Sequence, residues 1–127
     1  MSGGGGAGGG GAAGFVPGQL VLVHLIHPTE KFWGVLLDLG VAGVTLRALS
    51  VDSFDDWMSQ AARREPASLG LSTMFVPLFR VERMFLDEPV GQVESYRQRF
   101  ERRVGLRVED YLGLAVPDAA TDEAPPS

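Results

Sequence analysis

Residues 30–49, EKFWGVLLDLGVAGVTLRAL, carry two apolar runs on either side of a glycine-bounded turn. Between 32 and 39 successive residues would face opposite sides of a strand, so Trp33 and Phe32 would lie on different faces. Gly40 and Gly43 bound a tight turn, and the β pattern resumes at 44–49. The stretch therefore predicts an antiparallel hairpin at the centre of a small β-structure.

The segment before this hairpin adds another strand. Residues 20–26, LVLVHLI, form an apolar run between Pro17-Gly18 and Pro28. A short uninterrupted run of this kind is typical of a strand that is buried on both faces. Joined by a turn at 28–31, the three strands predict an antiparallel meander.

Beyond the hairpin the apolar residues recur every three or four positions. Residues 53–64, SFDDWMSQAARR, place Phe54, Trp57 and Met58 on one helical face. Ser53 and Asp56 fit a capping box, the two arginines at 63–64 suit the last turn, and the proline at 66 would stop the helix. We expect a helix here, inserted after the third strand.

Residues 72–76 and 81–86 return to a β pattern, and Pro77 between them should end a strand at an edge or bend. A second helix is expected to open at Asp87–Pro89 and a short third one to cover 108–112. Closure would protect the sheet edges. The chain therefore predicts an α+β fold: a small five-stranded antiparallel β-barrel, with an inserted helix between strands three and four and a C-terminal helix.

Two local patterns resemble known families. FWGVL at 32–36 and FVPLFRV at 75–81 resemble motifs of the Sm-like and SH3-like small β-barrels, which implies their fold for about residues 19–86. DLGVAG at 38–43 resembles the DxSxxG turn of PilZ domains, which bind a cyclic dinucleotide. Gly40 stands where that turn has serine, and 15–37 contains no arginine. The resemblance to the Sm-like proteins concerns their fold and does not extend to the motifs with which they bind RNA.

Both ends of the chain differ in composition from its middle. Residues 1–14 are almost entirely glycine and alanine, and 115–127 are rich in proline, alanine and acid. Neither segment offers enough apolar surface to offset the entropy of ordering. We expect a disordered glycine-rich tether at 1–14, a single domain at 15–114 and a disordered tail at 115–127.

Composition narrows the function classes. The chain has no cysteine, which excludes disulfides, thiolate zinc sites and thiol nucleophiles. Three of the 16 acids lie in the tail, so the expected domain holds 13 acids against 11 bases, and this balance argues against a nucleic-acid partner. No apolar run approaches the ~20 residues of a membrane span. We expect a cytoplasmic protein that contacts no membrane.

No catalytic or metal-binding pattern emerges. His24 and His27 are three positions apart on an expected strand and would face opposite sides, so they cannot share a metal. Asp55 and Asp56 are explained by the first turn of a helix, and with Asp52 they lack the glycine and distal glutamate of a calcium loop. We therefore expect no enzymatic activity, no metal and no cofactor.

One cluster of arginines is the candidate for anion binding. Arg99, Arg102 and Arg103 would lie on the outer part of the second helix. Acids are interspersed with them, and residues 88–113 contain five bases and five acids. This pattern favours a solvated, charge-balanced face over a nucleic-acid contact.

Aromatic residues indicate the partner-binding candidates. The expected domain holds more phenylalanine and tryptophan than a core of this size should bury, and adjacent Phe32 and Trp33 should face opposite sides. One of these two is expected to anchor a partner. The leading hypothesis is a binding or scaffolding module that contacts a protein or a second copy of itself. The alternative is an Sm-like or PilZ-like receptor for RNA or a cyclic dinucleotide.

Overall fold

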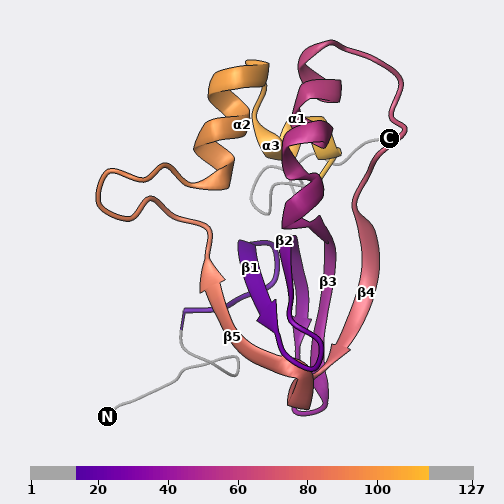
Figure 1. Cartoon of the computed structure of the whole chain (residues 1–127), viewed down its shortest axis with the longest axis vertical. Coiled ribbons are helices and arrows are strands. Elements are labelled where there is room, and N and C mark those ends of the chain that lie inside the picture. Colours follow the sequence, from indigo (N-terminus) through magenta and orange to yellow (C-terminus); the bar gives the residue numbers. More distant parts are fainter. Residues whose placement is uncertain (1–13, 115–127) are drawn as a thin grey trace, which may run out of the picture.

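The computed structural model describes residues 14–114, which form one five-stranded antiparallel sheet and three α-helices (Figure 1). The predicted α+β class is confirmed. The predicted tail at 115–127, and the predicted tether apart from Gly14, lie outside the described residues.

The sheet has the strand order β4-β3-β2-β1-β5. Its strands are β1 (Leu20–Leu25), β2 (Glu30–Leu39), β3 (Gly43–Ser50), β4 (Ser72–Pro77) and β5 (Val81–Leu86). The predicted meander is thus present as β1, β2 and β3.

The predicted closed barrel is not what the structure shows. Within residues 14–114, β4 pairs only with β3 and β5 pairs only with β1, so these two strands are the edges of the sheet. Pro77 ends β4, and the short 3₁₀ helix η3 (Leu78–Arg80) reverses the chain before β5. Figure 1 shows β4 and β5 meeting near η3 and diverging from there toward the helices.

The helices gather at the other end of the sheet (Figure 1). After β3 come the 3₁₀ helix η2 (Val51–Ser53) and α1 (Phe54–Ala62), and after β5 come α2 (Tyr96–Val104) and α3 (Val108–Leu112). The inserted helix is confirmed, but its predicted cap is wrong. The Ser53 side chain makes no capping hydrogen bond, whereas the Ser50 hydroxyl accepts from the Asp52 amide at 3.2 Å and begins η2.

The second helix begins later than predicted. Val90 and Val93, which a helix that opens at Asp87–Pro89 would include, are 68% and 70% exposed in the loop that precedes α2. The helix starts at a capping box in which the Ser95 hydroxyl accepts from the Gln98 amide at 3.0 Å and the Gln98 side chain accepts from the Ser95 amide at 2.9 Å. This local pair satisfies the amides of Ser95 and Gln98, so the helix is capped at Ser95, and Asp87–Pro89 belongs to the segment before it.

Both faces of the sheet carry a buried cluster. The first lies between the sheet and the helices and is made of Leu20, Trp33, Val35, Leu49, Phe54, Trp57, Met58, Ala61, Phe100, Val104 and Val108. The second lies on the opposite face and is made of Val21, Val23, Leu25, Leu36, Val44, Leu46, Ala48 and Val76. Met84 of β5 also packs against this second cluster, so the two edge strands bend around one apolar centre.

Gly34 allows this bend. A Cβ atom at this position would lie 2.1 Å from the carbonyl oxygen of Arg47 and 2.5 Å from the Cβ of Ala48 on β3. Only glycine fits such a close approach of β2 to β3.

Candidate functional site

Of the two predicted partner-binding residues, Trp33 lies in the interior and Phe32 is half-buried. Trp33 is fully buried, contacts Phe54 edge to face at 5.1 Å between ring centroids, and donates its indole Nε1–H to Asp87 Oδ2 at 3.1 Å. Phe32 is half-buried and packs against the second cluster. Neither side chain is fully exposed, because the helices cover one face of the sheet and the second cluster lies on the other. That Phe32 or Trp33 contacts a partner stays a prediction.

Two of the three candidate arginines on α2 are paired with acids of the same chain. Arg99 forms an ion pair with Asp55 of α1, and its guanidinium lies 5.2 Å from the centroid of the Phe54 ring. Arg102 makes two hydrogen bonds to Glu94, at 2.9 and 2.7 Å, and this contact lowers the pKa of the Glu94 carboxyl. Arg103 is exposed. The three side chains therefore do not form one unpaired basic surface.

The two histidines lie in different surroundings. His24 lies on β1, edge-on to Phe85 of β5 at 5.0 Å between ring centroids, whereas His27 is exposed in the turn after β1. Burial lowers the pKa of His24, the neighbouring Lys31 and Arg83 lower it further, and Glu82 opposes them. Among residues 14–114, no group of three histidine or carboxylate side chains could hold a metal ion.

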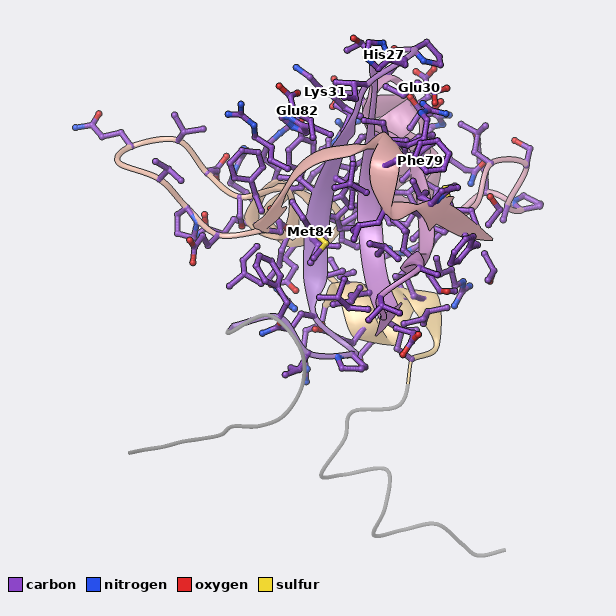
Figure 2. The ribbon with its side chains drawn as sticks, turned by 90° about the horizontal axis from the view of Figure 1, so that it is seen from below. His27, Glu30, Lys31, Phe79, Glu82 and Met84 are labelled. Atoms are coloured by element: carbon purple, nitrogen blue, oxygen red, sulfur yellow. The ribbon has the colours of Figure 1, made fainter. Side chains whose placement is uncertain are left out.

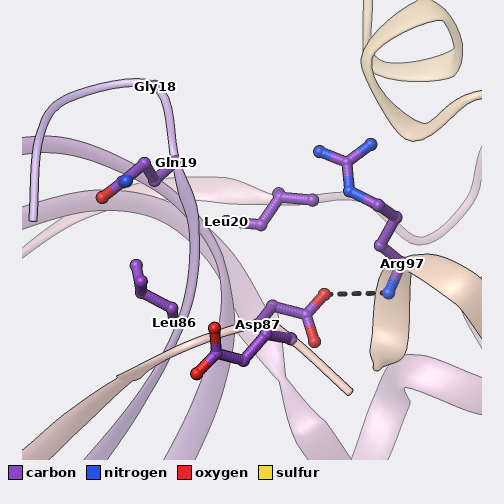
Figure 3. Close-up of a pocket in the computed structure, with 7 residues that line it drawn as sticks. Gly18, Gln19, Leu20, Leu86, Asp87 and Arg97 are labelled. Atoms are coloured by element: carbon purple, nitrogen blue, oxygen red, sulfur yellow. Dashed lines mark hydrogen bonds between the residues drawn. The ribbon is translucent and has the colours of Figure 1, made fainter. Parts of the chain in front are cut away.

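A hollow of about 320 Å³ lies between the start of β1, the end of β5 and α2 (Figure 3). It is lined by Gly18, Gln19, Leu20, Leu86, Asp87, Glu88 and Arg97. The Asp87 carboxylate accepts from the amides of Tyr96 and Arg97, both at 2.8 Å, in addition to the Trp33 indole.

The Arg97 guanidinium beside this hollow is likewise engaged. It forms ion pairs with Glu101 and Glu109, and its hydrogen bond lowers the pKa of the Glu109 carboxyl. The residues around the hollow therefore connect α2 to the sheet. The charges of Asp87 and Arg97 are already paired with other groups of the fold.

One surface with exposed apolar side chains, two of them aromatic, lies around η3. We call it the β4–η3 patch, and its members are Val41, Phe75, Leu78 and Phe79, exposed to 98%, 56%, 46% and 81% respectively. Figure 2, which views the molecule from below, shows Phe79 on the curved segment that joins β4 to β5.

Three contacts show that the segments of the patch are neighbours. The Leu78 amide donates to the carbonyl of Ala42 in the β2–β3 turn at 2.9 Å, and Gly43 pairs with Pro77 across β3 and β4. The Phe75 ring lies over Gly43, where an added Cβ would be 2.7 Å from the ring's Cζ. The turn, the end of β4 and η3 thus form one continuous surface.

The sequence indicated a surplus of aromatic residues but not which of them are exposed. Phe75 and Phe79 belong to the same run, 75–81, that resembles the small barrels, and the proline between them was the available signal for an irregular, exposed bend. Comparison of this chain with known protein families, curated proteins and solved structures found no match. Across residues 14–114, every helix is too short or too polar to span a bilayer.

Proposed function

We propose that this chain is a non-enzymatic binding module and that the β4–η3 patch is its contact surface for another protein. The observation that carries the proposal is the exposure of four large apolar side chains on adjoining segments. Water contact with apolar surface costs roughly 25 cal/mol per Å², so a partner that covers the patch would gain this free energy. Exposed aromatic side chains of this kind are frequent anchors of protein interfaces.

The backbone beneath the patch is well fixed. The Arg80 guanidinium, at the end of η3, donates to the carbonyls of Ile26 at 2.6 Å and Pro28 at 2.9 Å, and pairs with Glu30 at 2.9 Å. These contacts tie η3 to the β1–β2 turn. A partner would meet Phe79 on a prearranged support, which lowers the entropy lost on binding.

The uncharged character of the patch favours a protein over a polyanion. None of its four members carries a charge. Two of the three candidate arginines on α2 are already paired, Arg99 with Asp55 of α1 and Arg102 with Glu94 of the loop before α2. A receptor for RNA or a cyclic dinucleotide remains the alternative function, and salt dependence separates the two. We expect no binding of either ligand at about 150 mM salt, where charge contacts are screened beyond about 8 Å.

The alternative is tested by titrating a labelled RNA oligonucleotide and a cyclic dinucleotide into the full chain at low and physiological salt. The matched variant carries Arg99→Gln, Arg102→Gln and Arg103→Gln together. Sub-micromolar binding at physiological salt that is lost in this variant would replace the proposed function by the alternative.

The proposed function is tested by quantitative affinity capture from extracts of the native cells with the full chain as bait. Phe79→Ser removes the most exposed aromatic ring of the patch, and Phe85→Ser removes a partly exposed ring on the other edge of the sheet. We expect a partner whose yield falls about tenfold with Phe79→Ser and is unchanged with Phe85→Ser, since one lost anchor costs about 1.4 kcal/mol or more. Equal recovery by both variants would refute the assignment of the patch.

A further inference from the structure

We propose that the free edge of β4 pairs, antiparallel, with β4 of a second copy of this chain, so that one sheet continues across two molecules. The proposal goes beyond the proposed function. It concerns the backbone edge of β4, which shares only Phe75 with the β4–η3 patch. Phe79, the side chain that tests the patch, lies in η3 outside this edge, so the two proposals can fail separately.

The edge of β4 has unpaired backbone groups. β4 is hydrogen-bonded to β3 on one side, from Gly43–Pro77 to Ala48–Ser72. Within residues 14–114, no backbone or side-chain hydrogen bond reaches its other side. Figure 1 shows β4 as the outermost strand on its side of the sheet. A row of unpaired N–H and C=O groups is a template that another strand can complete.

The side chains of β4 do nothing to protect this edge. Its sequence, STMFVP, contains no charged residue, and its pairing with β3 has no register shift. The single proline, Pro77, stands at the last position and leaves the preceding residues free to pair. Natural edge strands that stay unpaired usually carry charges, bulges or an internal proline.

The opposite edge shows these protections. β5 contains Glu82 and Arg83, and its register with β1 shifts between His24 and Leu25. The shift interrupts a regular ladder, and charges discourage a second strand. The contrast identifies β4 as the edge that accepts a partner.

A second copy is the occupant that fits the chemistry of β4. When a strand pairs antiparallel with itself about a twofold axis, the residues at the axis meet themselves or a residue two positions away, so a charge there would face or lie beside a like charge. β4 has no charge to repel. Alternation also places Thr73 and Phe75 of both copies on the same face of the joined sheet, so the two half-exposed Phe75 rings would share one apolar surface.

The first measurement is the mass of the full chain by sedimentation equilibrium as its concentration is raised. A single six-residue strand pair is a small interface, so we expect a dimer with a dissociation constant on the order of 10 µM. Phe75→Lys places a like charge beside the axis and should raise that constant at least about tenfold, whereas Phe85→Lys on β5 should leave it unchanged.

The second measurement locates the contact. The chain has no cysteine, so a single introduced thiol can only bridge two molecules. Thr73→Cys and Phe75→Cys lie on β4, and Glu82→Cys lies on β5 as the matched control. We expect rapid disulfide-linked dimers for one or both β4 thiols, since bridging requires Cα atoms within about 7 Å, and slow linkage for the control.

Each result decides the proposal. Dimers that link through β4 and weaken with Phe75→Lys support it. A chain that stays monomeric at about 200 µM, or a dimer that links equally through β5, overturns it. If a monomeric chain still captures a protein in a Phe79-dependent way, the pairing of β4 is refuted and the proposed function stands; a monomer without such a partner removes both.

Discussion

Replacing Asp87 by alanine should destabilise the domain more than its position at the surface end of β5 would suggest. Its carboxylate accepts from the Trp33 indole at 3.1 Å and from the amides of Tyr96 and Arg97 at 2.8 Å. These donors come from the core of the sheet and from the first turn of α2. Asp87 thus joins two parts of the fold, and Glu88 beside it, exposed and without any such bond, is the matched control.

The magnitude follows from the three donors. Leaving the buried Trp33 N–H without an acceptor costs about 1–3 kcal/mol. Water can reach the two helix amides, so losing the carboxylate there costs about 0.5–1 kcal/mol through the unpaired donors and the helix dipole. Asp87→Ala should therefore lower the free energy of unfolding by about 2–4 kcal/mol, and Glu88→Ala should change it by less than about 0.5 kcal/mol.

The assay is equilibrium unfolding in urea, followed by the fluorescence of Trp33 and Trp57, which are both buried in the folded chain. A double-mutant cycle isolates the indole contact: Trp33→Phe keeps the ring and removes the donor. In that background Asp87→Ala should cost about 1–2 kcal/mol less than in the wild type. If Asp87→Ala and Glu88→Ala have the same effect, or if the cycle shows no coupling, Asp87 does not hold α2 to the sheet as described.

Four other substitutions test the packing, the caps and the titration of the fold. Trp57→Ala should cost about 3–5 kcal/mol in urea unfolding, because the ring is 1% exposed and stacks on Phe100 at 4.9 Å between centroids; a neutral result would place that face of α1 outside the core. Ser95→Ala should cost about 1 kcal/mol and Ser53→Ala markedly less, since only Ser95 caps a helix with its side chain; equal losses would contradict this difference. Burial lowers the pKa of His24 below 6.5, so the unfolded chain takes up this proton first and stability should fall as the pH drops from about 6.5 toward the folded-state pKa. His24→Gln should flatten that part of the profile, and an unchanged slope in thermal melts would exclude His24 as its source.

The sequence was most informative where a short pattern determines the structure. The alternation between 32 and 39, the glycine turn after it and the switch to a helical period after 53 correctly predicted β2, β3 and α1. Each of these depends on side chains a few residues apart. The start of α2 depends on a local signal as well, the Ser95–Gln98 capping box, but the proline at 89 favours an earlier start in the sequence.

The rest could not be predicted because it depends on contacts between distant residues. Trp33 and Asp87 are 54 positions apart, and nothing local shows that the carboxylate accepts the indole proton. Trp33 is buried because helices pack on one face of the sheet, and Phe32 is half-buried because the second cluster lies on the other face. Neither packing can be read from the residues around positions 32 and 33. The open edge likewise depends on where η3 directs β5, which the 75–81 run alone does not fix.

The same glycine turn that marks the hairpin in the sequence also shapes the proposed binding surface. Gly43 opens β3, and without a side chain there the Phe75 ring can lie flat over the backbone of β3. A Cβ at this position would meet the ring at 2.7 Å and the carbonyl of Val76 at 2.2 Å, so any other residue would displace the end of β4. The Leu78 amide donates a hydrogen bond to the carbonyl of Ala42 in the same turn. The positions of Phe75 and Leu78 therefore depend on how the hairpin turns, and the patch is built into this end of the sheet.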